Sequence, residues 1–273
     1  MTDSLVALAL AASVLVAAVI PVSAQPATLY AAHRGGSLLW PENSLLAFRN
    51  AVALGADYIE FDIHLSKDSE VVVIHDPTLD RTTSGSGPVR ERTLAELRAL
   101  RLRDRDARVT EETVPTLDAV AQLAAGSRVR MLLEIKVDER GQRYPGIEEK
   151  ALAVLGRHGM GPRTIVMAFE PETWRRVREL GPDAQVGALY SPQTLEPAAM
   201  KSRLLELKQA GIGFVGLSQA LVTKETVALA REAGLLLGVW TVNDPGPLRR
   251  FIEAGVGIVI TDRPDLAKEL LER

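Results

Sequence analysis

Two carboxylates in one short stretch of the chain could bind a metal ion. Residues 58–76 read YIEFDIHLSKDSEVVVIHD. Side chains alternate between the two faces of a β-strand, so an extended segment 58–66 would place Glu60 and Asp62 on the same face. Two partly buried carboxylates on one face repel each other and lose solvation. Because hard cations such as Ca²⁺ and Mg²⁺ take carboxylate oxygens as ligands, we predict that Glu60 and Asp62 bind one.

A second segment repeats this spacing and adds a positive charge. Glu134 and Lys136 lie two residues apart in the sequence LLEIK. We predict that Glu134 is a third oxygen ligand, and that Lys136 and Arg34 hold an anion beside the cation. His33 and His75 could exchange protons on either side of that anion, since imidazole titrates near neutral pH. Such a set of groups favours chemistry at a phosphoryl group.

The elements that must bring these residues together alternate regularly along the chain. Strands are predicted at residues 28–32, 58–66, 71–74, 129–135, 164–169, 185–190, 214–217, 235–242 and 257–260. Helices are predicted at residues 45–54, 94–102, 116–125, 147–158, 171–180, 198–210, 223–233 and 245–254. This alternation indicates an α/β fold with a parallel sheet covered by helices. A (β/α)₈ barrel fits, and barrel enzymes carry their sites at the C-terminal ends of the strands.

One consecutive pair of strands lacks a helix between its members. The gap between 58–66 and 71–74 is too short for the crossover that parallel neighbours need, so this pair is predicted to form an antiparallel hairpin. The hairpin would extend the second barrel strand past the rim and leave eight strands for the barrel. It would also return His75 to the rim near Glu60 and Asp62. We interpret His64, which lies toward the hairpin tip, as structural or as a support for a site residue rather than as catalytic.

The composition excludes several classes of function. The formal net charge is −3 over 273 residues and aromatic residues make up 4%, so neither a basic surface nor a stacking platform indicates nucleic acid as a partner. The chain has no cysteine, which excludes disulfides, thiolate metal ligands and a cysteine nucleophile.

The N-terminus is typical of a secretory leader. An apolar run at residues 5–20 is followed by Pro21 and the small-residue pattern Val22-Ser23-Ala24. We predict a signal peptide at 1–24 and a secreted or periplasmic protein. The first four residues carry no Lys or Arg, so an uncleaved membrane anchor is the alternative. Cleavage after Ala24 would leave 273 − 24 = 249 residues.

The motifs occur in an order that resembles a known family. Residues 33–83, HRGGSLLWPENSLLAFRNAVALGADYIEFDIHLSKDSEVVVIHDPTLDRTT, are similar to the N-terminal signature of glycerophosphodiester phosphodiesterases. That signature reads HRG, PENT, AF, GAD, IE-x-D, TKDG, VV-x-HD and L-x-RTT. LLEIK, WTVN at 240–243 and ITDRP at 260–264 resemble its later motifs.

This resemblance implies a fold, a reaction and a set of site residues. The fold would be a (β/α)₈ TIM barrel of the phospholipase-C-like phosphodiesterase type, with the hairpin after the second strand, over residues 28–268. The reaction would be metal-dependent hydrolysis of a small-molecule glycerophosphodiester to glycerol phosphate and an alcohol. The implied roles are acid–base catalysis for His33 and His75, Ca²⁺ or Mg²⁺ binding for Glu60, Asp62 and Glu134, and substrate binding for Arg34, Lys136 and Trp240.

Other functions remain to be weighed against this one. A lysophospholipase D or related phospholipase on the same fold is the alternative, and it would need a long acyl groove. Contact with a membrane would then come only from a lipid substrate or an uncleaved leader. A barrel amidohydrolase would carry a His-x-His pair on its first strand, whereas residues 31–33 contain one histidine. Trp240 is equally compatible with packing in the core.

Overall fold

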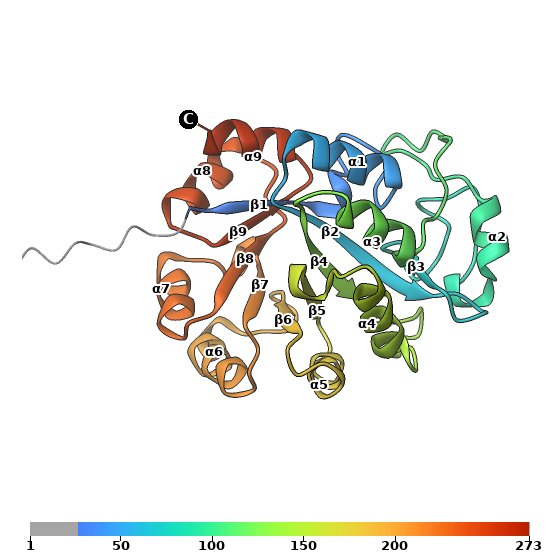
Figure 1. Cartoon of the computed structure of the whole chain (residues 1–273). Helices are drawn as coiled ribbons and strands as arrows, with labels where there is room; N and C mark the ends of the chain where they lie inside the picture. Colours follow the sequence, from blue (N-terminus) through green and yellow to red (C-terminus); the bar gives the residue numbers. More distant parts are fainter. Residues whose placement is uncertain (1–26, 273) are drawn as a thin grey trace, which may run out of the picture.

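Parallel strands close into a barrel at the centre of the molecule. The computed structural model describes residues 27–272. The barrel strands in this range are β1 (Leu29–Ala32), β2 (Tyr58–Leu65), β4 (Arg130–Ile135), β5 (Thr164–Ala168), β6 (Gln185–Tyr190), β7 (Phe214–Ser218), β8 (Leu236–Trp240) and β9 (Ile258–Thr261). Each pairs in parallel with its neighbour, and β1 pairs with both β9 and β2, which closes the barrel (Figure 1). The predicted (β/α)₈ architecture is therefore confirmed.

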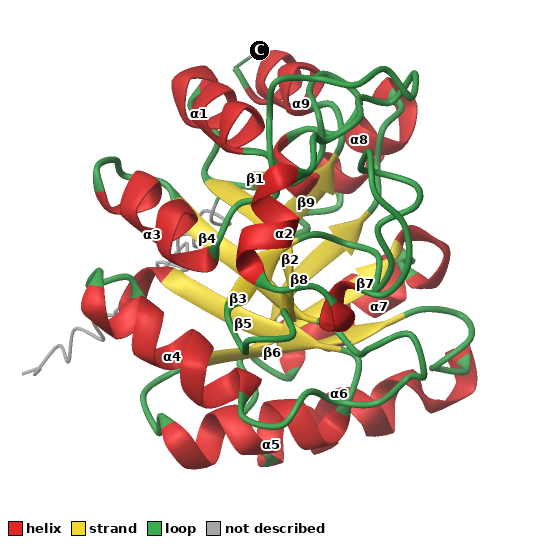
Figure 2. Cartoon of the chain, turned by 90° about the vertical axis from the view of Figure 1, so that its right-hand side faces the viewer, coloured by secondary structure: helices red, strands yellow, loops and turns green. Residues whose placement is uncertain are grey.

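Helices surround the strands, as Figure 2 shows from the side. They are α1 (Leu45–Leu54), α2 (Leu94–Ala99), α3 (Leu117–Ala125), α4 (Ile147–Arg157), α5 (Pro171–Leu180), α6 (Met200–Gln209), α7 (Lys224–Glu232), α8 (Pro245–Glu253) and α9 (Pro264–Leu271). The short α2 stands apart from the others, on the loops that lie beside the hairpin.

The predicted hairpin is present and extends β2 beyond the barrel. β3 (Val71–Val73) pairs antiparallel with the end of β2, with Ile63 opposite Val73 and Leu65 opposite Val71. The other side of β2 pairs in parallel with β4. The first part of β2 therefore belongs to the barrel, while its last residues carry the chain out to the turn and back to His75.

Alternation along β2 separates the core from the site. Ile59, Phe61 and Ile63 are fully buried against the helices, and the ring of Phe61 lies 5.6 Å from that of Phe48 on α1. That helix begins after Ser44, whose hydroxyl oxygen accepts a hydrogen bond from the backbone N–H of Ala47 at 3.0 Å. This bond fixes the point where the loop from the first strand enters α1.

The barrel interior is packed below the site. The ring of Phe214 occupies space left by three glycines, because a Cβ atom at Gly187, Gly216 or Gly238 would come within 3.2 Å of it. Leu132 and Ile165 are buried in the same cluster. This apolar layer fills the barrel interior, as is usual for this fold.

Most elements differ from the sequence prediction by a residue or two at an end, and three of the differences are as follows. The helix predicted at 94–102 ends at Ala99, because Leu102 pairs with Thr83 in an isolated β-bridge. β8 ends at Trp240 rather than at residue 242. α9 was not predicted, although Pro264 at its start is a typical first helical residue.

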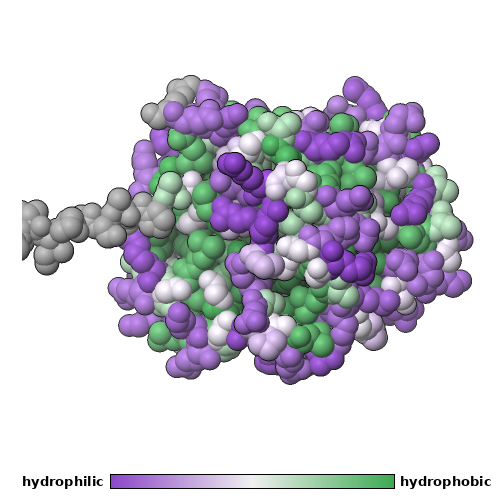
Figure 3. Space-filling model, in the orientation of Figure 1, coloured by the Kyte–Doolittle hydropathy of each residue, from purple (hydrophilic) through white to green (hydrophobic). Residues whose placement is uncertain are grey.

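The surface of the described region has no single apolar face. Figure 3 shows hydrophilic and hydrophobic residues interspersed on the side seen in Figure 1. The exposed large hydrophobic residues are Val109, Leu180, Leu205 and Leu236, on separate elements. Between residues 27 and 272 no helix is both long enough and apolar enough to cross a bilayer. The predicted leader at 1–24 lies outside the described residues.

Candidate active site

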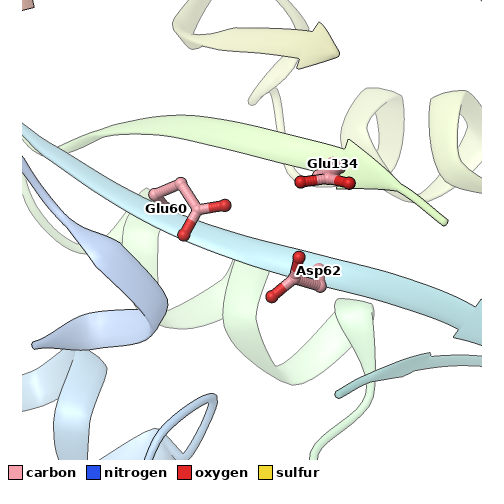
Figure 4. Close-up of side chains that lie close together, drawn as sticks. All are labelled: Glu60, Asp62 and Glu134. Carbon is pink, nitrogen blue, oxygen red and sulfur yellow. The ribbon is translucent and has the colours of Figure 1, made fainter. Parts of the chain in front are cut away.

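Three carboxylates converge at the C-terminal side of the barrel, as the sequence predicts. Glu60 and Asp62 project from β2, and Glu134 projects from β4, where it lies directly opposite Asp62 in the parallel register. One carboxylate oxygen from each lies within 4.8 Å of the others (Figure 4). Their exposed fractions are only 2%, 1% and 8%. A cluster of buried carboxylate oxygens of this size could hold a divalent cation.

The electrostatics of the cluster also fit a bound cation. Burial raises the pKa of Glu60 well above its usual value, and the charges of Asp62 and Glu134 raise it further. Burial also raises the pKa of Asp62, but Lys136, His75 and Arg34 outweigh this effect, so its net pKa is lowered. Glu60 is thus repelled by the two neighbouring carboxylates, and a divalent cation would relieve this repulsion.

Two buried polar atoms beside the cluster lack partners. The side-chain amide of Asn43 donates to Asp62 Oδ2 at 3.0 Å, while its Oδ1 accepts no hydrogen bond. The Nε of Arg34 is likewise unpaired and lies 3.8 Å from the same Asp62 oxygen. Buried polar groups are normally satisfied, so such atoms are expected where a ligand or its water molecules bind.

The two predicted cations flank the carboxylates. The backbone N–H of Arg34 donates to Glu60 Oε2 at 2.9 Å, and its guanidinium donates to Glu42 at 3.1 Å. The Nζ of Lys136 donates to Glu134 Oε1 at 2.7 Å and lies 3.6 Å from Asp62 Oδ1. Both side chains remain positively charged there, in position to bind an anion.

Each of the two predicted histidines is held through Nδ1 by an aspartate. His33 Nδ1 lies 2.6 Å from Asp262 Oδ1, and His75 Nδ1 lies 2.7 Å from Asp76 Oδ1. The opposite nitrogen of each ring turns toward the site. His33 Nε2 lies 3.9 Å from Glu60, and His75 Nε2 lies 3.3 Å from the Nζ of Lys136.

Sequence reasoning did not assign roles to these two aspartates. The signal was nonetheless available, because Asp76 follows His75 in the HD motif and Asp262 lies in ITDRP. Asp262 also accepts hydrogen bonds from Ser37 at 2.6 Å and Asn243 at 2.7 Å. Burial raises its pKa, but these bonds and the charge of His33 lower it to about 2. Asp262 therefore remains a carboxylate at neutral pH.

The groups surround a cavity of about 170 Å³. Its polar wall consists of His33, Arg34, Glu60, His75, Glu134, Lys136 and Thr241. Its apolar wall consists of Met167, Phe169, Leu189, Trp240 and Ile260. The rings of Phe169 and Trp240 meet edge to face with their centroids 5.8 Å apart. A carboxylate oxygen of Asp62 lies within 4.8 Å of those of Glu60 and Glu134, so the structure brings all eight predicted residues to one place.

His64 lies outside the cavity lining. It is fully buried, its Nδ1 lies 2.9 Å from the hydroxyl of Tyr144, and its Nε2 lies 3.0 Å from the carbonyl oxygen of His75. Burial lowers its pKa to about 4, so the ring is neutral and donates to that carbonyl. These contacts agree with the structural interpretation of His64, which supports the backbone at His75.

Comparison with known proteins places the chain in a family. The model of the glycerophosphoryl diester phosphodiesterase family matches residues 33–266. The chain belongs to this family. It is 35% identical over 250 residues to a glycerophosphodiester phosphodiesterase of Caldanaerobacter subterraneus, covering 90% of this chain and 98% of that protein.

Solved structures from the same family share the fold. A glycerophosphodiester phosphodiesterase from Agrobacterium tumefaciens superposes with a TM-score of 0.74 at 28% identity, covering 89% of this chain and 99% of that one. An Oleispira antarctica phosphodiesterase, solved in complex with the product sn-glycerol-3-phosphate, superposes with a TM-score of 0.76 at 26% identity, covering 90% and 98%. The protein is therefore a phosphoric diester hydrolase on a (β/α)₈ barrel.

Proposed function

We propose that the protein hydrolyses glycerophosphodiesters to glycerol phosphate and an alcohol, with a divalent cation, Ca²⁺ or Mg²⁺, held by Glu60, Asp62 and Glu134. The observation that carries this proposal is the buried carboxylate cluster next to two cations and two histidines in one cavity. The product complex of the Oleispira antarctica relative supports glycerol phosphate as the part of the substrate that the cavity retains.

Two side chains of this protein would bind the phosphate. Arg34 and Lys136 both line the cavity, and charge-assisted hydrogen bonds from such cations to phosphate oxygens are strong. A divalent cation bound by the carboxylates would add positive charge beside the same oxygens. The apolar wall formed by Phe169 and Trp240 would contact the carbon atoms of the glycerol or of the alcohol.

The two histidines would move the protons. An oxygen nucleophile forms a bond to phosphorus while one imidazole takes its proton at Nε2. The phosphorus–oxygen bond to the alcohol then breaks, and the other imidazole gives a proton from its Nε2 to the leaving oxygen. The Nδ1 contacts to Asp262 and Asp76 leave both Nε2 atoms directed toward the site for this exchange, with the Nζ of Lys136 lying 3.3 Å from Nε2 of His75.

The nucleophile is either water or a neighbouring hydroxyl of the substrate glycerol. Attack by the hydroxyl would produce a five-membered cyclic phosphate before glycerol phosphate appears. Phosphorus NMR during turnover separates the two routes, since the cyclic ester has its own resonance.

A coupled assay for glycerol phosphate tests the proposed function. We expect activity on several glycerophosphodiesters with Ca²⁺ or Mg²⁺ and none with EDTA. Full activity of Glu60→Ala would contradict the metal assignment. The substrates should include lysophosphatidylcholine, the substrate of the alternative function. At about 170 Å³ the cavity is smaller than the roughly 300–1,000 Å³ of pockets for drug-sized ligands, so we expect the soluble diesters to react faster.

A leaving-group comparison tests the histidines. His75→Ala should lose activity on a choline diester, because the choline oxygen needs a proton to leave. The same variant should lose less on a p-nitrophenyl diester, whose leaving group is already stable as an anion. If His75→Ala hydrolysed the choline diester at the wild-type rate, His75 would have no catalytic role.

We also propose that residues 1–24 direct export, so that the enzyme is secreted or periplasmic. N-terminal sequencing of protein from the extracellular or periplasmic fraction should find Gln25 first. Recovery of the whole chain in the membrane fraction would favour the uncleaved anchor instead.

A further inference from the structure

Arg81, in the LDRTT segment, binds two carboxylates at once. Its Nε and Nη2 donate to the two oxygens of Asp76 at 2.7 and 2.9 Å. Its Nη1 and Nη2 donate to the two oxygens of Glu42, both at 2.8 Å. The guanidinium thus uses two edges to form two bidentate pairs, a geometry that a lysine ammonium cannot reproduce.

Each of these carboxylates continues to a residue of the cavity wall. Asp76 Oδ1 lies 2.7 Å from His75 Nδ1, and Glu42 Oε1 accepts from the Arg34 guanidinium at 3.1 Å. Burial raises the pKa of Glu42, but the hydrogen bonds from Arg81 and the charge of Arg34 lower it further than burial raises it. Glu42 therefore stays ionised and keeps both of its arginine partners.

The contacts form a closed ring that includes His75, Arg34 and Lys136 of the polar wall of the cavity. In this ring the Nε of Arg34 lies 3.8 Å from Asp62 Oδ2, and the Nζ of Lys136 lies 3.6 Å from Asp62 Oδ1. Lys136 lies 3.3 Å from His75, whose partner Asp76 leads back through Arg81 and Glu42. Arg81 is the member contributed by residues 77–113, and the other members come from the first loop, β2, the residue that follows β4 and the end of the hairpin.

We propose that Arg81 is a positioning residue that fixes His75 and Arg34 relative to each other by binding Asp76 and Glu42 together. The inference depends on the proposed function, in which His75 and Arg34 act on the phosphodiester. Arg81 itself is not among the described residues that line the cavity, and its side chain is 49% exposed. It therefore acts through its two carboxylate partners.

The kinetic test compares Arg81→Ala with a matched control. We expect kcat to fall about 10- to 100-fold with a smaller change in KM, as for other residues that orient a catalytic group. Arg101 lies in the same segment, has a side chain 47% exposed, and binds the carbonyl oxygen of Glu111. The kcat of Arg101→Ala should stay within about twofold of the wild-type value. Equal activities of the two variants would overturn the proposal.

Chemical rescue shows whether Arg81 acts through its two bidentate hydrogen-bonded pairs or only through its positive charge. Guanidinium added to Arg81→Ala should restore part of kcat, whereas methylammonium should not, because only guanidinium forms both bidentate pairs. Arg81→Lys should remain impaired for the same reason. Wild-type activity in Arg81→Lys, or equal rescue by the two cations, would overturn the proposal.

A measurement without turnover keeps the test independent of the proposed function. The chain has four histidines, so ¹⁵N-labelled imidazoles can be resolved by NMR. In the wild type His75 should carry its proton on Nδ1, and Arg81→Ala should lose this tautomer and regain it with guanidinium. An unchanged His75 spectrum in Arg81→Ala would refute the link. A wild-type enzyme inactive on every diester would refute only the proposed function.

Discussion

His33 Nδ1 lies 2.6 Å from Asp262 Oδ1, although 229 positions separate the two residues in the chain. The contact joins the end of the first barrel strand to the end of the last one, across the line where β1 and β9 close the barrel. The orientation of the His33 imidazole therefore depends on the pairing of β1 with β9.

Replacing Asp262 by Asn should disable His33 without unfolding the protein. The amide can present an N–H to Nδ1 and favour the wrong tautomer, so we expect kcat to fall at least about 100-fold. Ser37→Ala removes one hydrogen bond to Asp262 and serves as the graded control, with a loss of about tenfold or less. Steady-state kinetics at pH 7 measure both. Similar activity in Asp262→Asn and wild type would show that Asp262 does not orient His33.

Glu60→Gln should lower the affinity for the metal ion without lowering the stability of the metal-free protein. Because burial and two neighbouring carboxylates raise the pKa of Glu60, its neutral isostere should be tolerated in the absence of the cation. We expect Ca²⁺ or Mg²⁺ to raise the melting temperature of the wild type and to raise that of Glu60→Gln much less.

The matched control for this melting experiment is Glu148→Gln. Glu148 is equally buried but pairs with Arg143 at 2.6 Å, away from the cavity. This substitution should lower the melting temperature with or without metal and leave the metal-induced increase unchanged. An equal metal-induced increase in Glu60→Gln and wild type would remove Glu60 from the ligand set.

His64 should make the stability depend on pH below neutrality. Its pKa is about 4 in the folded protein against the usual 6.5 of a histidine, so the unfolded chain binds a proton more readily. The contribution of neutral His64 to the free energy of unfolding is complete above pH 6.5 and is lost as the pH falls toward 4. Between pH 7 and 4.5 the loss amounts to about 2–3 kcal/mol.

Urea unfolding between pH 4.5 and 7.5, with a chelator present, measures this effect. His64→Gln should flatten the dependence, since a glutamine amide can still donate to the His75 carbonyl but does not titrate. His158→Gln is the control, because His158 pairs with the half-exposed Asp118. If the free energy of unfolding depended on pH equally in His64→Gln and wild type, His64 would not be the group responsible.

Trp240→Ala should weaken substrate binding more than it slows the chemical step. Removing the indole opens the apolar wall beside Phe169, and we expect KM to rise about tenfold with kcat nearly unchanged. Diesters with different alcohols locate the contact. An equal increase in KM for all of them would place Trp240 against the glycerol, and an unequal one against the alcohol. An unchanged KM for every diester would leave Trp240 as core packing.

Ser69→Gly should stabilise the hairpin turn. Ser69 has φ of 62°, a conformation that costs an L-residue roughly 1–2 kcal/mol and that glycine adopts without strain. The greater entropy of glycine in the unfolded chain offsets part of this gain, so the net stabilisation should be about 0.5–1 kcal/mol. Urea unfolding measures the change. Ser86→Gly should give no gain, because Ser86 is not among the described residues with positive φ. A loss of stability in Ser69→Gly would contradict this interpretation.

The predicted elements show which features could be read locally. The helices at 45–54 and 171–180 and the strand at 185–190 have the predicted bounds, since their periodicity and the residues at their ends are contained in the segment. The helix predicted at 94–102 is three residues too long, because a distant partner, Thr83, takes Leu102 into a β-bridge. Propensity within the segment carries no information about that partner.

The sequence by itself determined the residue types of the site and the strands that carry them, because i, i+2 spacing places Glu60 with Asp62 on one face. Only the tertiary structure decided the partners of those residues: Asp262 for His33, and Arg81 and Glu42 between His75 and Arg34. These contacts join segments that approach each other only when the barrel closes and the hairpin folds back. A contact at such separation depends on the whole fold, whereas a spacing depends only on the local backbone.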